Sequence, residues 1–336
     1  MTVPKIIRAL SALLTILVVG FALGACGGDE EETPATSNPT EESTPASTSE
    51  SGGGTLIEAD PANEGKTLTI GSKNFAEQYI LGEIYAQGLE AAGFTVKKQL
   101  DLGSEQIAFK ALQSGRISAY PEYTGTALTS FYDVKIDDIP RDAQASFDLL
   151  AKEAQTDKLT AQPQTPFQNT FVVTSTKETA EKLGNPKTLT ELAKAGGSDV
   201  SISGFPECRQ RTDCLLGLRD SYDWKPEFVS SQGKYADLDN GDADLTFGFG
   251  TDGELQLGKY YTYEDDQQLF PPYYITLLTS EQGISDMGES GQAVVAKIQE
   301  PLTERVMQEL NSRVSIDKQK PEDVAADYLK SAGFVE

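Results

Sequence analysis

The 336-residue chain contains no histidine, three cysteines and a single tryptophan. Without histidine it cannot form a Ser-His-Asp or Cys-His catalytic unit, and it cannot bind a metal through imidazole. It also lacks the side chain that most often changes charge near neutral pH. We therefore expect a binding protein rather than an enzyme, with no catalytic residues, no metal and no cofactor.

Basic residues are scarce as well, with 28 Lys and Arg against 52 Asp and Glu, and the formal net charge is −24. A nucleic-acid-binding protein needs a basic face that releases counterions, so this balance excludes nucleic acid as a partner. The length suggests about two domains. Hydrophobic residues make up 38% of the chain, which allows a sizeable core.

The N-terminus has the pattern of an export signal. Lys5 and Arg8 precede an apolar run over residues 9–23, which is too short to span a membrane comfortably. The letters LGAC, ending at Cys26, then resemble a bacterial lipobox. This resemblance implies a signal peptide over residues 1–25 and diacylation of Cys26, and two acyl chains suffice for stable anchoring. An ordinary signal peptide or membrane anchor is the alternative.

A polar segment follows the cysteine. Residues 27–54 contain seven acids but no basic or aromatic residue and no Val, Ile, Leu or Met. Such a composition cannot bury enough apolar surface to offset the entropy lost on ordering. We expect residues 26–65 to form the acylated cysteine and a disordered acidic tether. The tether would hold the folded part at the outer face of the bacterial cell membrane.

From Lys66 onward, short β-prone runs alternate with amphipathic helical patterns. Capping-box spacing at residues 74–77 and 188–191 marks two helix starts. The expected strands cover residues 67–70, 94–100, 117–120, 170–175, 200–203 and 244–249, and the expected helices cover residues 75–92, 104–114, 213–220, 291–299, 301–311 and 321–332. This alternation predicts α/β layers arranged in two lobes.

Two further patterns need an interpretation. Residues 248–253 match G-x-G-x-x-G, but Asp252 stands where a pyrophosphate would approach, so a glycine-permitted turn is the better reading. Residues 253–259 match G-x-x-x-x-G-K, but Tyr260 replaces the Ser or Thr that would bind magnesium. Cys208 and Cys214 are predicted to form a disulfide because an exported protein meets an oxidising compartment. The alternative is a pair of free thiols.

Residues 70–81, with the sequence IGSKNFAEQYIL, resemble a known family. It comprises the extracytoplasmic substrate-binding proteins of ABC importers for glycine betaine, carnitine, choline and related osmoprotectants. Further matching motifs follow in order: EYTGT at 122–126, Pro206-Glu207 with Arg211 beyond, TDG at 251–253, LFPPY at 269–273, and the segment 303–311. The resemblance covers the chain from about Lys66 to Phe334.

The resemblance implies an α/β periplasmic-binding-protein fold of type II, with two lobes and a ligand in the interlobe cleft. We place lobe 1 at residues 66–168 plus 275–336 and lobe 2 at residues 169–274. It also implies an aromatic box around a quaternary ammonium group and a set of polar residues that hold a carboxylate. The box positions are Tyr123, Phe171, Phe249 and Tyr273, and the carboxylate-holding positions are Lys73, Thr126 and Arg211.

These residue types suit such a ligand. A trimethylammonium group has no N–H to donate, so aromatic faces are its natural partner, while Arg211 and Lys73 complement a carboxylate. Phenylalanine at positions 171 and 249, where tyrosine is usual in the family, leaves the preferred osmolyte open. Phe247 and Arg209 are possible substitutes for Phe249 and Arg211. We assign Trp224, the only tryptophan, to packing.

The sequence therefore predicts a monomeric, lipid-anchored binding protein that delivers a glycine betaine-like zwitterion to a separate ABC permease and ATPase. One alternative is a choline-specific protein, in which an acid near the box would compensate the ligand charge. Glu122 is the closest candidate in sequence for that acid. An extracytoplasmic hydrolase that uses paired carboxylates, and a structural or adhesive surface protein, are the alternatives from other classes.

Overall fold

The computed structural model describes residues 55–336, so the predicted signal peptide, Cys26 and residues 27–54 of the tether lie outside the described residues. The ordered chain begins earlier than the expected start at Lys66. The Asp60 side chain caps a short 3-10 helix, η1 (Pro61–Asn63). The Asn63 side chain is fully buried and donates to the Ala92 carbonyl at 2.8 Å. The end predicted for the tether, residue 65, is therefore wrong, because these residues pack against the folded part.

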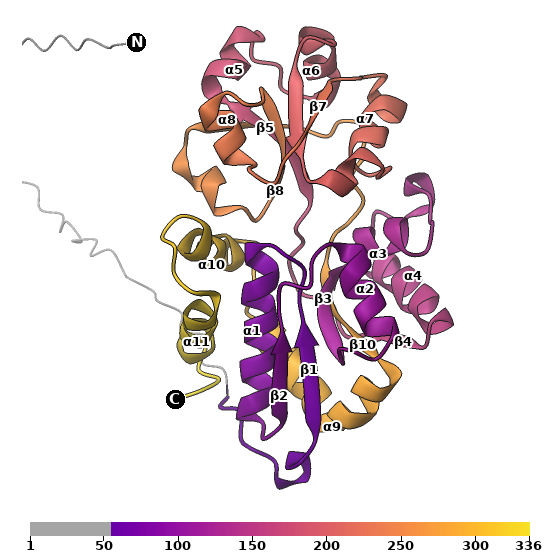
Figure 1. The fold of residues 1–336 in the computed structure, drawn as a ribbon, viewed down its shortest axis with the longest axis vertical. Helices are drawn as coiled ribbons and strands as arrows, with labels where there is room; N and C mark the ends of the chain where they lie inside the picture. The colour runs from indigo at the N-terminus through magenta and orange to yellow at the C-terminus, as the bar shows by residue number, and fades with distance from the viewer. Residues whose placement is uncertain (1–54) are drawn as a thin grey trace, which may run out of the picture. The chain divides into compact units, whose positions relative to one another are not determined.

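The first sheet has five strands in the order β2-β1-β3-β10-β4. Their bounds are β1 (Thr67–Gly71), β2 (Thr95–Gln99), β3 (Ala119–Tyr123), β4 (Leu159–Ala161) and β10 (Ile275–Ser280). β1 pairs in parallel with β2 and β3, whereas β10 runs antiparallel to β3 and β4. The chain thus returns to its first sheet after building the second (Figure 1).

The second sheet has the order β7-β6-β8-β5-β9. Its strands are β5 (Phe171–Thr176), β6 (Ser201–Gly204), β7 (Glu227–Ser230), β8 (Leu245–Phe249) and β9 (Tyr260–Tyr263). β6 pairs in parallel with β7 and β8, and β5 runs antiparallel to β8 and β9. Each sheet and the helices around it form one lobe (Figure 1).

Helices cover both sheets. Around the first sheet lie α1 (Ala76–Ala91), α2 (Glu105–Gln113), α3 (Thr124–Ser130), α4 (Ala143–Thr156), α9 (Glu281–Gln299), α10 (Glu304–Ser315) and α11 (Pro321–Ser331). Around the second lie α5 (Lys177–Lys182), α6 (Leu189–Gly196), α7 (Leu215–Tyr222) and α8 (Tyr235–Asn240). The remaining 3-10 turns are η2 (Ile136–Asp138), η3 (Pro206–Arg209) and η4 (Gly253–Leu257).

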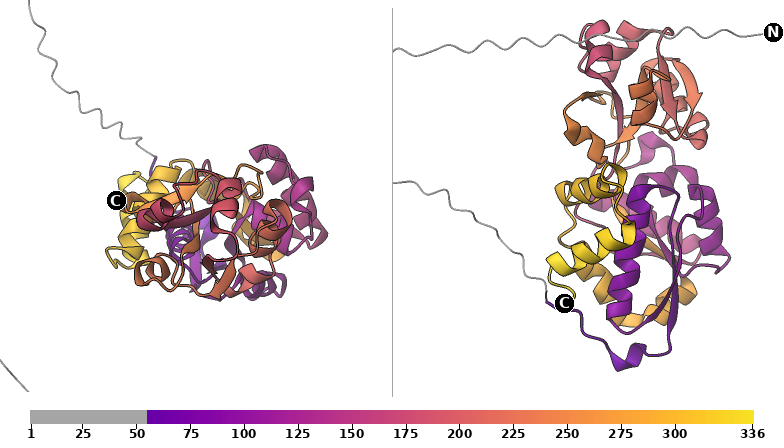
Figure 2. Two further views of the ribbon diagram at one scale, coloured as in Figure 1. Left: turned by 90° about the horizontal axis from the view of Figure 1, so that it is seen from above. Right: turned by 60° about the vertical axis from the view of Figure 1, so that its left-hand side comes forward.

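The start of α1 differs from its prediction. The N-cap residue is Phe75, and no side chain caps the helix, so Asn74 does not play the expected capping role. By contrast, the side chain of Thr188 accepts from the Glu191 amide at the start of α6, as predicted. α1 is buried over most of its surface because it packs against both β2 and α11, as Figure 2 also shows.

Two chain segments, residues 162–170 and 264–274, connect the lobes. They run antiparallel where they meet, with a β-bridge between Gln168 and Tyr274 and a hydrogen bond of 3.0 Å from the Asn169 amide to the Tyr273 carbonyl. α10 reaches the second lobe as well, because Gln308 Nε2 donates to the Gly250 carbonyl at 2.9 Å. These connections place the ends of β3, β5 and β8 around a shared space.

Candidate functional site

A cavity of about 380 Å³ lies between the lobes, lined by residues of both. Lys73, Tyr123 and Thr126 come from the first lobe, and Phe171, Arg211 and Phe249 come from the second. Tyr273 comes from the connecting segment just before β10. All seven residues predicted from the family motifs to bind the ligand therefore line the same cavity.

Four of these residues are the predicted rings. Phe171 and Phe249 are register partners on the antiparallel strands β5 and β8, and their ring centroids lie 5.0 Å apart. Tyr273 meets Phe171 edge to face at 5.5 Å with an interplanar angle of 89°. Tyr123 belongs to the first lobe and contacts none of these three rings directly. A fifth ring lies between Tyr123 and Phe249.

That fifth ring is Phe75, which was expected only as the first residue of the helix over residues 75–92. It stacks with Tyr123 at 6.2 Å and with Phe249 at 6.1 Å, and it lines the cavity. The five rings thus form a continuous series from Tyr123 through Phe75, Phe249 and Phe171 to Tyr273. Phe75 lies inside the IGSKNFAEQYIL motif, and this position is the only sign in the sequence that it lines the site.

The glycine of the EYTGT motif, Gly125, is required by the close packing of α3 against the segment that carries Tyr273. A Cβ atom added to Gly125 would lie 2.8 Å from the Pro272 carbonyl oxygen and 2.8 Å from a ring carbon of Tyr273. The absence of a side chain therefore lets α3 approach the segment that carries Tyr273. Thr124 strengthens this approach, because its hydroxyl donates to the same Pro272 carbonyl at 2.8 Å.

Lys73 forms a buried ion pair with Glu122, and its ammonium also lies 4.7 Å from the centroid of the Tyr123 ring. Glu122 is fully buried and accepts from the Tyr120 hydroxyl at 2.6 Å as well. The acid nearest the box in sequence is therefore already neutralised by a lysine of the protein. It does not serve as the separate counter-charge that the choline alternative requires.

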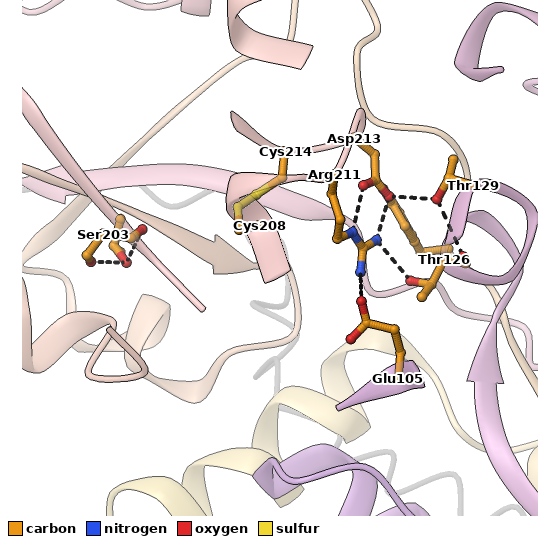
Figure 3. The surroundings of a disulfide bond; sticks show 10 residues. Glu105, Thr126, Thr129, Ser203, Cys208, Arg211, Asp213 and Cys214 are labelled. Atoms are coloured by element: carbon orange, nitrogen blue, oxygen red, sulfur yellow. Dashed lines mark hydrogen bonds and ion pairs between the residues drawn. A yellow bond between two sulfur atoms is a disulfide. The ribbon is translucent and has the colours of Figure 1, made fainter. Parts of the chain in front are cut away.

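Arg211 occupies a second charged corner (Figure 3). Its Nε and a terminal nitrogen donate to the two oxygens of Asp213 at 2.7 and 2.5 Å, and Glu105 lies 3.4 Å away. The guanidinium also lies 3.4 Å from the Thr126 hydroxyl and 5.5 Å from the Phe171 centroid. Burial raises the pKa of Asp213, but the Arg211 charge lowers it further, so the net shift is downward.

A disulfide joins Cys208 to Cys214 and closes the loop that carries Arg211 and Asp213 (Figure 3). Both cysteines are fully buried, and their Cα atoms lie 5.3 Å apart. The guanidinium and its main carboxylate partner thus lie on one cross-linked loop. Their relative position depends little on how the two lobes are arranged.

Lys234 is a third cation at the cavity, and the sequence analysis did not select it. Its ammonium pairs with Asp252 at 2.6 Å and lies 4.9 Å from the centroid of Phe249. Asp252 also accepts from the Phe249 amide at 2.8 Å, which ties it to the end of β8. The acid that argued against phosphate binding in the G-x-G-x-x-G motif therefore binds the backbone amide of Phe249 and the ammonium group of Lys234.

Glu77 is a third site residue that the sequence alone did not reveal, because it was assigned to a capping box. Its side chain is 3% exposed, lines the cavity and accepts four hydrogen bonds. The donors are the Tyr123 hydroxyl at 2.8 Å, Asn169 Nδ2 at 2.8 Å, the Thr251 hydroxyl at 2.5 Å and Asn311 Nδ2 at 2.9 Å. Burial raises the pKa of Glu77, and the four donors oppose this shift without cancelling it.

Phe247 and Arg209, the possible substitutes for Phe249 and Arg211, do not line the cavity. Phe247 is fully buried and packs edge to face on Phe171 at 6.1 Å without lining the cavity. Arg209 is exposed and lies over Phe228 at 4.9 Å. Trp224 is buried and donates to the Gly197 carbonyl at 2.7 Å, which agrees with its assignment to packing.

Within residues 55–336, no cluster of three or more His, Cys, Asp or Glu side chains is arranged to hold a metal ion. No helix in this part of the chain combines the length and the apolar character needed to cross a bilayer.

Two α/β lobes around an aromatic cavity define the class of two-lobed binding proteins. A solved structure described as a glycine betaine/carnitine/choline ABC transporter has this fold, with a TM-score of 0.63 and 22% identity over 78% of this chain and 97% of that one. The likeness identifies the fold as the type II periplasmic-binding-protein fold, as predicted.

Residues 66–331 match the family model described as the substrate binding domain of ABC-type glycine betaine transport system. The glycine-betaine-binding protein of Pseudomonas aeruginosa is 31% identical over 80% of this chain and 88% of its own length. The glycine betaine-binding protein YehZ of Escherichia coli is 26% identical over 82% and 93%. The chain belongs to this family of extracytoplasmic substrate-binding proteins, which bind a small ligand, work with an ABC permease and are not enzymes.

Proposed function

We propose that this protein captures a quaternary-ammonium osmoprotectant of the glycine betaine type in the aromatic cavity between the lobes and delivers it to its permease. The observation that carries the proposal is the continuous aromatic series from Tyr123 to Tyr273 in one cavity. Each desolvated cation–π contact contributes about 2 kcal/mol, so several rings support binding at about the micromolar level after association costs. Thr126, Lys73 and Arg211 would receive the ligand carboxylate.

Choline is a second candidate, favoured by the charges of the cavity. The lining residues include three cations, Lys73, Arg211 and Lys234, and each is paired with a carboxylate of the protein. The lining acids are more numerous: Glu77, Glu105, Glu207, Asp252 and Glu254. A ligand carboxylate must therefore compete with protein carboxylates, whereas a simple cation meets no such competition.

Titration calorimetry of the purified protein against glycine betaine, carnitine, proline betaine, choline and proline tests the proposal. Micromolar binding of one or more betaines with no heat from proline is the expected result. Heat from choline alone would preserve the aromatic cage but contradict the roles given to Lys73 and Arg211. No heat with any quaternary amine would overturn the proposal.

We further propose that the mature protein begins at a diacylated Cys26 and acts as a lipid-anchored monomer. The lipobox-like letters LGAC and the acidic composition of residues 27–54 support this anchoring. Intact-mass analysis of the membrane-extracted protein is expected to show a chain starting at Cys26 with the added acyl mass. A soluble chain without that mass would contradict the anchor.

A further inference from the structure

Glu77 differs from the other buried acids at or next to the cavity in the kind of partners that it has. Glu122 pairs with Lys73, Asp252 with Lys234 and Glu105 with Arg211. Glu77 makes no ion pair within residues 55–336, and all four of its partners are neutral.

The geometry favours the ionised form of this side chain. A carboxylate has about four lone-pair positions, and the four partner atoms can fill all of them as donors. The two amide nitrogens of Asn169 and Asn311 can only donate. The orientation of Asn311 is secured by its second acceptor, the Thr251 carbonyl at 2.9 Å. A buried charge that is solvated only by neutral donors keeps most of its field, which extends into the cavity that it lines.

We propose that Glu77 is the counter-charge of the cavity, a carboxylate that attracts the ammonium group of the ligand beside the Tyr123 ring. The inference rests on the proposed function and names the chemical feature that the site selects, which is a positive charge and not only an apolar trimethyl shape. The Tyr123 hydroxyl donates to Glu77, so a cation on the Tyr123 ring would lie close to the Glu77 carboxylate.

Binding then depends on pH in a defined direction. The ionised form of Glu77 attracts the cation, so affinity is full above the pKa of Glu77 and falls as pH drops through that value. Burial raises this pKa, so the loss begins at a higher pH than it would for an exposed glutamate. Of the charged groups on the surrounding elements, Glu122 on β3 pairs with Lys73, Asp252 after β8 pairs with Lys234, and the four direct partners carry no charge.

A pair of isosteric ligands separates charge from shape. Choline and its uncharged carbon analogue 3,3-dimethyl-1-butanol have nearly the same volume, so the ratio of their affinities reports the electrostatic preference of the site. In Glu77→Gln this ratio is expected to fall about tenfold or more relative to the wild-type protein. Glu254→Gln is the matched control: Glu254 lines the same cavity but is partly exposed, so its loss should change the ratio far less.

The wild-type protein supplies a second readout that needs no mutant. Its affinity for choline should fall with decreasing pH while its affinity for dimethylbutanol stays constant. If Glu77→Gln weakens both ligands equally, Glu77 only positions the cavity walls and the inference is overturned. A ratio that is constant with pH in the wild type overturns it even where the mutant does not fold. Silence of the wild type toward every quaternary amine would instead overturn the proposed function, and this inference with it.

Discussion

Asp213 and Glu77 are both buried carboxylates, and each accepts a hydrogen bond from a tyrosine of the cavity, Tyr273 at 2.7 Å and Tyr123 at 2.8 Å. Their pKa values nevertheless shift in opposite directions. Burial raises both, but the bidentate contact with Arg211 brings the pKa of Asp213 below its usual value, whereas Glu77 has only neutral donors. The charges at the Asp213 corner of the site are therefore compensated within the protein, whereas the charge of Glu77 is not.

The largest expected effect comes from breaking the Asp213 corner. In Asp213→Asn the buried Arg211 loses its ionised partner, which should reduce the free energy of unfolding by about 3–5 kcal/mol. Denaturant unfolding measures the change. Glu178→Gln is the control, because it removes an ion pair of 2.8 Å with Lys182 from the surface and should have little effect. Equal stability of the Asp213 variant would show that Arg211 finds sufficient compensation in Glu105.

Removing the cross-link of the same corner should have the next largest effect. The disulfide closes a short loop with a sequence separation of 6 residues, so Cys208→Ala with Cys214→Ala should lower stability by about 2 kcal/mol. Because Arg211 and Asp213 lie on that loop, affinity for a ligand carboxylate should fall as well. Unfolding and betaine titration of the double variant test this. Unchanged betaine affinity would show that the disulfide is not needed to position Arg211 for the ligand.

The cage ring of the Asp213 corner can be tested by truncation. Tyr273→Ala removes both a cation–π face and the hydroxyl that donates to Asp213, so affinity for quaternary amines should fall at least about tenfold. Tyr273→Phe retains the ring and should keep most of the affinity. Calorimetry measures the affinity of both variants, and circular dichroism shows whether each is folded. Wild-type affinity in the alanine variant would remove Tyr273 from the site.

The Arg211→Lys variant tests whether Arg211 binds the carboxylate end of the ligand. Lysine keeps a charge beside Asp213 but loses the planar fork that suits a carboxylate. Affinity for glycine betaine should therefore fall several-fold more than affinity for choline, which has no carboxylate. Equal losses for the two ligands, measured by the same titrations, would contradict the assigned polarity of the cavity.

The smallest effect concerns pH and stability. The folded pKa of Glu77 is raised, so the folded state takes up a proton before the unfolded state does. The contribution of Glu77 to stability therefore increases as pH falls through its folded pKa, and the increase is complete below the unfolded value of about 4.3. Asp213, whose pKa is lowered, contributes in the opposite sense and loses stability below about pH 3.9. Unfolding of wild type and Glu77→Gln from pH 4 to 7 should show a larger increase in the wild type, because Glu90, whose pKa burial also raises, contributes equally to both proteins.

Local sequence pattern predicted much of the first lobe. The strand expected at 67–70 is β1, and the helix expected at 75–92 is α1 with its start shifted to Ala76. Helices α3 and α4, and the first half of α9, were not predicted; in α9 the non-helical Gly288, with a φ of 59°, separates the two halves. β10 was missed too: its six residues are all buried, and they pair antiparallel with strands more than a hundred residues away.

The amino-acid sequence by itself determined the chemical inventory of this protein. The lack of histidine, the excess of acids and the motif residues Lys73, Tyr123, Thr126, Phe171, Arg211, Phe249 and Tyr273 were all present in the printed letters. Only the tertiary structure decided which charges are compensated, because pairs such as Lys73 with Glu122 join residues 49 positions apart. The same is true of Glu77, whose four donors come from β3, a connecting segment, the loop after β8 and α10. A carboxylate solvated from four separate elements leaves no local pattern, since hydrogen bonds depend on proximity in space and not on spacing along the chain.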